Sequence, residues 1–377
     1  MRMTVAQPQL LKSLQLIEHA VNDRSALPIL ANVLLETKDQ ELMLTATDLD
    51  VGVRYQLPLT EQAESGAVTL PARRLTTIIR ELPEEPVTIE AKHNHTAIVS
   101  CGTSRFRLPG LPPEDFPILP LPAHTNTIST SQPTLKTLIT QTIFAMSMEE
   151  TRFVLNGALL KTTPDTLALV TTDGRRLAVA TAREEHPHAQ PLSVVIPAKT
   201  IRELGRLLQE DRDEPVTIAS IKDNQLLFQF SAEGGSVAGG GAVTIITRLI
   251  EGQFPQYESV IPAPTHSTLT CSRQLLAGAV RRASLMTTAA SQAVVFELAK
   301  DRVVVSKESA ELGSAREELP ATYRGEAMTI AFNPEFWLDA LKVLEADDVT
   351  IEVTSPEKPA AIRLPQFLYI VLPMKLA

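Results

Sequence analysis

The stretch Leu70-Pro71-Ala72-Arg73-Arg74-Leu75-Thr76-Thr77-Ile78-Ile79-Arg80-Glu81-Leu82 decides the fold of this 377-residue chain. It has the pattern of a strand end, a proline at the first helical position and an amphipathic helix. Arg73 and Arg80 lie one heptad apart on its polar face. A basic helix face is usually solvated surface, so the segment alone indicates no function. The i, i+3, i+4, i+7 spacing predicts one buried face, formed by Leu75, Ile78, Ile79 and Leu82.

The same helix pattern occurs three times, at intervals of roughly 125–135 residues, far longer than the period of a solenoid repeat. The second copy begins at Ile196-Pro197-Ala198-Lys199 and the third at Phe332-Asn333-Pro334-Glu335. Arg80 is replaced by Arg206 and Lys342, and Arg73 by Lys199 and Glu335. The apolar faces of the two later copies are formed by Ile201, Leu204 and Leu208, and by Trp337, Ala340, Leu341 and Leu344.

This period predicts three domains of one kind, spanning residues 1–122, 123–262 and 263–377. Each offers two helices and roughly eight strands, so we predict an α+β fold with helices packed on antiparallel sheets. The segment 109–122 contains six prolines. Proline fixes φ and removes a backbone donor, so this segment is predicted to be a linker or extended edge segment rather than a helix.

The amino-acid composition is typical of a globular protein with a net negative charge. Apolar residues make up 44% and charged residues 21%, and the net charge is −9 at pH 7. The only cysteines, Cys101 and Cys271, are expected to be reduced thiols of a cytosolic protein. We find no signal-peptide pattern and no apolar run long enough to span a membrane, and therefore expect a cytoplasmic protein.

Catalytic motifs are missing, so we expect neither an enzyme nor a cofactor or metal site. His93 and His95 have no third zinc ligand nearby. Asp48 and Asp173 recur at equivalent positions and are expected to close turns. The glycine-rich segment 234–241 predicts a hairpin tip; a phosphate-cradling loop is the alternative, but no Lys-Ser/Thr pair follows it.

Positive charge is concentrated on the repeated helices. If the six helices share one surface, that surface is basic and suited to phosphate contact without base readout. The alternative is that these are ordinary solvated helix faces. The residues concerned are Arg73, Arg74, Arg80, Lys199, Arg202, Arg206, Arg273, Arg281, Arg282 and Lys342.

Short motifs in all three domains resemble the bacterial sliding clamp family, the beta subunit of DNA polymerase III. Each motif is short, but their order and spacing together are specific and cover the whole chain. In the first domain they are Leu27-Pro28-Ile29-Leu30, Ala46-Thr47-Asp48-Leu49, Phe106-Arg107-Leu108-Pro109 and Glu114-Asp115-Phe116-Pro117. In the second they are Leu155-Asn156-Gly157, Thr172-Asp173-Gly174-Arg175-Arg176-Leu177-Ala178 and Glu251-Gly252-Gln253-Phe254-Pro255-Gln256-Tyr257. In the third they are Phe332-Asn333-Pro334 and Leu372-Pro373-Met374-Lys375-Leu376.

The resemblance implies a head-to-tail homodimer that closes a ring around duplex DNA and slides on it. Such a ring is a processivity factor that tethers the replicative polymerase, the clamp loader and repair proteins. Family DNA contacts carry over to Arg24 and Arg73, and Phe153 could pack on a nucleotide, whereas Glu149 would repel phosphate. The DNA-binding candidates are Arg24, Arg73, Arg80, Phe153, Lys199, Arg202, Arg206 and Lys342.

The resemblance also implies a pocket for partner peptides between the second and third domains. An apolar groove with Met374 at its floor suits short peptides with hydrophobic anchors. Arg175 stands where the family often has histidine, which would tune partner preference. The matching positions are Thr172, Gly174, Arg175, Arg176, Leu177, Pro255, Val260, Ile370, Leu372, Pro373, Met374 and Leu376.

Two other functions stay open. A second, specialised clamp copy would differ in its partner preference at the pocket. A sequence-independent DNA-binding protein that forms no ring would use the same basic helices. A hydrolase on this repeated scaffold has no residues to support it.

Overall fold

A computed structural model describes residues 1–22, 24–59, 61, 63–119, 126–149, 151–185, 190–221, 224–232 and 241–375. The chain divides into two compact units. Unit 1 contains Met1–Lys136, His188–Gln190 and Arg202–Leu249; unit 2 contains Thr137–Pro187, Pro191–Ile201 and Ile250–Ala377. The predicted second domain therefore contributes elements to both units. The domain boundaries at residues 122 and 262 stay predictions.

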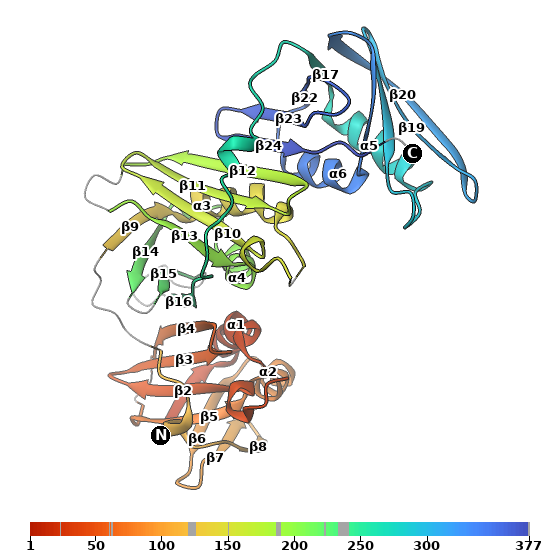
Figure 1. Cartoon of the computed structure of the whole chain (residues 1–377). Coiled ribbons are helices and arrows are strands. Elements are labelled where there is room, and N and C mark those ends of the chain that lie inside the picture. The colour runs from red at the N-terminus through yellow and green to blue at the C-terminus, as the bar shows by residue number, and fades with distance from the viewer. Residues whose placement is uncertain are drawn as a thin grey trace. The chain divides into compact units, whose positions relative to one another are not determined.

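Unit 1 contains two antiparallel sheets (Figure 1). The four-stranded sheet has the order β1-β6-β7-β8, with bounds Arg2–Ala6, Pro86–Ala91, Thr96–Cys101 and Ser104–Pro109. The eight-stranded sheet has the order β5-β2-β3-β4-β16-β15-β14-β9. Its strands are Gly66–Pro71, Asn32–Lys38, Glu41–Thr47, Val51–Pro58, Ala242–Arg248, Gln225–Ser231, Pro215–Ile221 and Asn126–Ser131.

Unit 2 is organised around a twelve-stranded sheet with the order β13-β10-β11-β12-β24-β23-β22-β17-β20-β19-β18-β21. Its first four strands are Ser193–Pro197, Gly157–Thr163, Thr166–Thr172 and Arg176–Arg183. The next four are Phe367–Val371, Ala360–Leu364, Asp348–Val353 and Thr268–Ser272. The last four are Gly313–Arg324, Arg302–Ser309, Val294–Ala299 and Met328–Phe332.

The helices follow the predicted repeat. The first domain contributes α1 (Gln7–Ile17) and α2 (Ala72–Glu81), which pack against each other, as do α5 (Arg273–Ser284) and α6 (Pro334–Val343) of the third. The second contributes α3 (Gln132–Thr142) and α4 (Ala198–Leu207). The chain thus contains three tandem copies of one fold of mixed helix and sheet, as predicted.

Strand order repeats with the domains. The order β1-β6-β7-β8 returns as β9-β14-β15-β16 and as β17-β22-β23-β24, and β5-β2-β3-β4 returns as β13-β10-β11-β12 and as β21-β18-β19-β20. Consecutive domains are joined by equivalent antiparallel pairs, β4 with β16 and β12 with β24. Among the described strands, β8 ends its sheet, and the Gly313–Pro320 part of β20 pairs with β19 alone.

Two details of the predicted helix need correction. Leu75 and Ile79 are fully buried, but Ile78 is only partly buried, because it lies over the sheet edge beside Phe106 and Leu108. Pro71 precedes the helix, which begins at Ala72, within the usual uncertainty of a helix end. The predicted tip at 234–241 lies outside the described residues except for Gly241.

Two strands have features that the sequence pattern does not mark. The N-terminal residues form β1 before α1 begins, and β20 is the longest strand of the described residues. One face of β20 is exposed throughout, and the other is intermediate or buried from Ala315 on; that second face mixes Ala315 and Glu317 with Leu319, so the apolar alternation of a half-buried strand is weak in the sequence. The hairpin of β19 and β20 is visible in Figure 1.

An aromatic cluster holds the second and third domains together inside unit 2. Tyr369 of β24 is fully buried, and its ring centroid lies 5.6 Å from that of Phe144 and 6.4 Å from that of Trp337. Its hydroxyl donates a hydrogen bond of 2.7 Å to the carbonyl oxygen of Phe336. Burial raises the pKa of Tyr369, so its hydroxyl stays protonated at neutral pH and can donate this hydrogen bond.

We expect Tyr369→Phe to lower the free energy of unfolding by about 1–2 kcal/mol, because the buried carbonyl oxygen of Phe336 loses its donor. Tyr369→Ala also removes the ring contacts and should cost about 3–5 kcal/mol. Urea denaturation of the three proteins measures both losses. Equal losses in the two variants would show that the hydrogen bond, rather than the ring, holds this junction.

Candidate functional site

The first and second domains each contain a turn at the equivalent place, between β3 and β4 in the first domain and between β11 and β12 in the second. In the second domain, the backbone N–H groups of Arg175 and Arg176 donate to Asp173 Oδ1 at 2.8 and 2.9 Å. Thr172 Oγ1 donates to the carbonyl oxygen of Arg176 at 2.6 Å and accepts from Gly174 N at 3.0 Å. Gly174 has φ 83°, a left-handed conformation that suits glycine. The prediction that Asp173 closes a turn is confirmed.

Arg176 is held firmly between the two domains of unit 2. Its guanidinium pairs with Asp173 at 3.0 Å and with Asp339 of α6 at 2.7 Å, and it stacks over the ring of Phe336 at 4.4 Å. Burial lowers the pKa of Arg176, but the Asp339 hydrogen bond and the nearby negative charges raise it above its ordinary value. The side chain is therefore a fixed structural cation.

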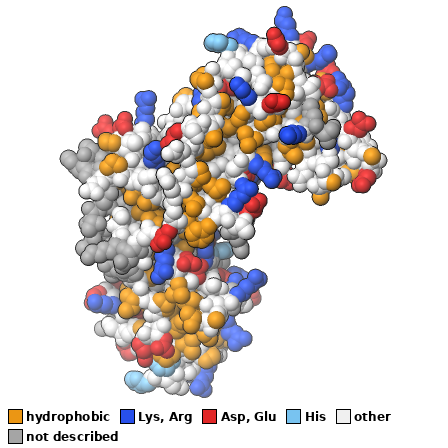
Figure 2. All heavy atoms as spheres, viewed as in Figure 1, with side chains coloured by type: hydrophobic (Ala, Val, Ile, Leu, Met, Phe, Trp, Pro, Cys, Tyr) orange, Lys and Arg blue, Asp and Glu red, His pale blue; other side chains and the backbone are white. Residues whose placement is uncertain are grey.

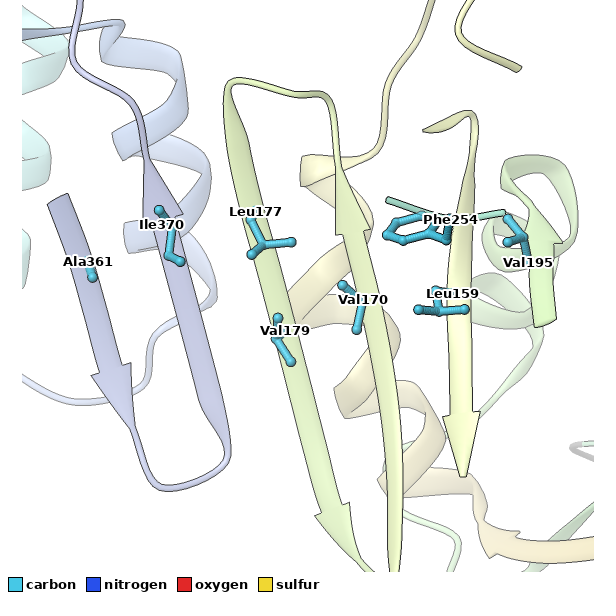
Figure 3. Packing of buried hydrophobic residues seen from close by; sticks show 8 residues of the cluster. All are labelled: Leu159, Val170, Leu177, Val179, Val195, Phe254, Ala361 and Ile370. Carbon is cyan, nitrogen blue, oxygen red and sulfur yellow. The ribbon is translucent and has the colours of Figure 1, made fainter. Parts of the chain in front are cut away.

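A pocket of about 180 Å³ opens beside this turn. Its base is formed by Leu177 and Ile370, which lie opposite each other in the β12–β24 pair. Figure 3 shows both side chains in one apolar cluster that also contains Val179 and Phe254. Figure 2 shows hydrophobic side chains gathered over β12 and β24. The pocket is lined by Leu155, Thr172, Gly174, Arg175, Arg176, Leu177, Pro255, Gln256, Tyr257, Val260, Pro359, Ile370 and Leu372.

Most of the predicted pocket residues meet at this place. Pro373 and Met374 do not line the cavity; the Met374 N–H instead donates to the carbonyl oxygen of Ala331 at 2.7 Å. Leu376 lies outside the described residues. Sequence reasoning missed four lining residues, and the adjacency of Gln256 and Tyr257 to Pro255 was the available signal for two of them. The lining residues that were not predicted are Leu155, Gln256, Tyr257 and Pro359.

The pocket rim is polar. Lys161 pairs with Glu258 at 3.0 Å and lies 5.9 Å from the centre of the Tyr257 ring. Both charged side chains are about half exposed, so the pair contributes little to stability. Arg175 is exposed at the mouth. An apolar floor with a polar rim of this kind suits a short peptide with hydrophobic anchors.

The predicted DNA-contact residues lie on the helices and the loops that follow them. Arg24 lies in a turn after α1, and Arg73 and Arg80 lie in the first and last turns of α2; all three are exposed. Lys199 is partly buried in the first turn of α4, and Arg202 and Lys342 are exposed.

Cations in a first helical turn oppose the helix dipole. The first turns of α2 and α4 contain no acidic residue and carry Arg73 and Lys199, whereas α6 has Glu335 there. The arrangement of α6 stabilises the helix end, and Asn333 Oδ1 accepts from Glu335 N at 2.9 Å. Arg73 and Lys199 therefore gain no stabilisation from the helix dipole, and their role in DNA contact stays a prediction.

Two other predicted residues have specific surroundings. Arg206 pairs with Glu203 at 2.8 Å and donates to the carbonyl oxygen of Leu16 at 2.7 Å, so it joins α4 to α1 within unit 1. Phe153 is 63% exposed and follows the Glu149–Arg152 ion pair of 3.0 Å. Their roles in DNA binding stay predictions.

Other chemistry is not evident in the described part of the chain. No group of three or more His, Cys, Asp or Glu residues there is placed to hold a metal ion. No helix within these ranges is long and apolar enough to cross a membrane. Burial raises the pKa of the Cys271 thiol to about 12, so this thiol is unreactive.

Comparisons with known proteins cover the whole chain. The DNA polymerase III beta subunit models match by domain: N-terminal at residues 1–120, central at 129–256 and C-terminal at 258–375. The beta sliding clamps of Pseudomonas putida and Escherichia coli are each 33% identical to it, with full coverage of both chains. The Pseudomonas aeruginosa sliding clamp bound to griselimycin has a TM-score of 0.92 at 32% identity, and the Bacillus subtilis clamp has 0.91 at 30%, each with 100% coverage of both chains.

We expect Asp173→Ala to lower the free energy of unfolding by about 2–3 kcal/mol, because it removes both the turn acceptor and a carboxylate beside the mostly buried Arg176. Asp173→Asn keeps a turn acceptor and should cost about half as much. Asp48→Ala is the matched control, since Asp48 closes the equivalent turn of the first domain. Chemical denaturation ranks the variants, and an Asp48→Ala loss as large as that of Asp173→Ala would contradict the role of Arg176.

Proposed function

The chain belongs to the DNA polymerase III beta subunit family, and we propose that it is a sliding clamp of the replication machinery. In this role two copies close head to tail into a ring around duplex DNA. The ring performs no chemical reaction. It slides in the cytoplasm and tethers the replicative polymerase, the clamp loader and repair proteins through the pocket beside Leu177 and Ile370.

The observation that carries this proposal is the repeated junction. The strand pairs β4–β16 and β12–β24 join consecutive domains, and β8 and β20 are the equivalent strands that lack such a partner among the described residues. Exposed strand edges favour pairing with another chain. A head-to-tail contact between β8 of one copy and β20 of another uses both edges. Closure of that contact after two copies gives a ring rather than a filament.

Phe106 supports the same contact. Its equivalents in β16 and β24, Ile245 and Tyr369, are fully buried at the internal junctions, whereas Phe106 is 38% exposed. Ile245 lies opposite Val53, and Tyr369 lies opposite Ala178. The same register in the dimer brings Phe106 opposite Ala315 of the second copy.

The basic helices supply a sliding surface in this proposal. Arg73 and Lys199 lie where backbone N–H groups at a helix N-terminus also favour an anion, which suits DNA phosphates. Contacts to phosphate alone carry no sequence preference. A closed ring needs no tight contact, because topology keeps it on DNA. This accounts for a net charge of −9 in a protein that encircles a polyanion.

The pocket gives the ring its tethering role. Its apolar floor and polar rim suit a linear peptide in an extended or turn conformation. A polymerase bound there stays at high effective concentration near the DNA after it releases the primer end. Arg175 at the mouth favours peptides that carry an acidic residue beside the apolar anchors.

Retention on DNA tests the ring. We expect protein loaded onto nicked circular DNA by a clamp loader to stay bound in about 0.5 M NaCl, at which phosphate contacts are largely screened. The same protein should leave once the circle is cut, because it slides off the end. Gel filtration of labelled protein with the DNA measures retention. Equal, salt-sensitive retention on circular and linear DNA would identify a non-ring DNA-binding protein instead.

The edge contact is tested separately. We expect Phe106→Glu to convert the dimer into a folded monomer, because it places a charge in an apolar interface. Phe153→Glu is the control: this side chain is also exposed but belongs to neither β8 nor β20, so the dimer should persist. Sedimentation equilibrium gives the mass of each variant. A dimeric Phe106→Glu protein would exclude the β8–β20 contact.

A further inference from the structure

The junction of the first two domains contains the same parts as the peptide pocket at the second junction. β16 pairs with β4 as β24 pairs with β12. Ile246 of β16 lies opposite Gly52, in the arrangement that places Ile370 opposite Leu177 at the base of the pocket. The two junctions therefore differ at the residue that forms half of the pocket floor.

The turn beside the first junction also matches. Thr47 Oγ1 accepts from Leu49 N at 3.0 Å, and Asp48 Oδ1 accepts from Val51 N at 2.8 Å, as the equivalent residues do in the second domain. Leu49 has φ 82°, almost the φ of Gly174, although leucine rarely adopts this conformation. The first junction therefore has the same turn backbone as the pocket, and Leu49 takes the left-handed conformation that Gly174 has there.

Leu119 fills the space that the side chain of Leu177 occupies at the second junction. A Cβ atom on Gly52 would lie 2.4 Å from Leu119 Cδ2, so a side chain at position 52 requires Leu119 to move from its place. Leu119 packs against Ala219, Leu227 and Ile246.

Leu119 belongs to the linker between the two domains. The buried Phe116 comes three residues before it, as the buried Phe254 comes three residues before Tyr257 of the pocket. Tyr257 and Leu119 are thus equivalent linker residues. Tyr257 forms part of the pocket wall at the second junction, whereas Leu119 packs into the floor at the first.

A second difference lies on the same sheet face. At the first junction Arg54 lies opposite Thr45, and at the second junction the equivalent residues are Val179 and Val170. A guanidinium at the first junction therefore replaces the valine methyl groups that lie next to the pocket floor at the second. Burial lowers the pKa of Arg54, with Glu36 acting in the opposite direction. A peptide with an apolar anchor loses contact area here and meets a partly desolvated charge. Leu119 and Arg54 therefore act against peptide binding in different ways.

We propose that the first junction is a copy of the peptide pocket that this chain closes with its own linker. Leu119 is the occupant, and Gly52 is the residue that admits it. The inference rests on the proposed peptide-binding role of the second junction. Its consequence is that each chain has one open pocket, so a ring of two copies binds two partner peptides and not four.

A thermal-stability cycle tests the place of Leu119. We expect Gly52→Leu to lower the melting temperature, because the new side chain meets Leu119, and Leu119→Ala to lower it by leaving a cavity. The double variant should melt above Gly52→Leu alone, because the new leucine fills the cavity. Gly52→Leu with Ile118→Ala is the control, since Ile118 is 92% exposed and its removal should give no rescue. Additive losses in the Gly52/Leu119 pair would overturn the proposal.

Peptide stoichiometry tests the closure. The probe is a short synthetic peptide with leucine and phenylalanine side chains as anchors, measured by isothermal titration calorimetry. We expect one peptide per wild-type chain and two per chain of the Gly52→Leu/Arg54→Val/Leu119→Ala variant, with the second site weaker. One peptide per chain in that variant, once thermal melting shows that it is folded, would overturn the proposal. A wild-type chain that binds none would overturn the proposed pocket instead, and the stability cycle would still decide the place of Leu119.

Discussion

The antiparallel pairing of consecutive domains is the interaction on which the rest of the structure depends. In a sheet, every edge strand presents N–H and C=O groups that need partners. The pairs β4–β16 and β12–β24 satisfy these groups by using the last strand of one domain as the neighbour of the preceding domain. The same pairing brings Leu177 opposite Ile370 and buries Tyr369 against Phe144. The pocket and the stability of the junction therefore have one cause.

This pairing also bears on the proposed binding of DNA by an acidic protein. Strand pairing and apolar packing hold consecutive domains together, so the helices need not attract one another across the junctions. Their exposed faces are free to hold cations, even where these oppose the helix dipole, as at Arg73 and Lys199.

Much of this was available from the sequence, because apolar periodicity marks elements with one buried face. The helix stripe of Leu75 and Ile79 and the recurring Asp48 and Asp173 turns are examples. The strand β20 was not predictable in this way, because its less exposed face mixes Ala315 and Glu317 with Leu319, so its apolar alternation is weak. Pro359 in the pocket was missed for a different reason: only the tertiary fold brings its loop to the β11–β12 turn.

The three domains share one backbone fold but differ in the side chains at several equivalent positions. Equivalent positions carry Leu177 and Gly52 at the two junctions, and Arg73, Lys199 and Glu335 at the three helix starts. A duplicated fold constrains the residues that close turns and fill cores, since every copy needs them, and leaves the outer positions free to diverge. A recurring turn or core residue in such a chain is therefore evidence for folding, whereas a difference between copies, such as Leu177 and Gly52, indicates that the two junctions have different roles.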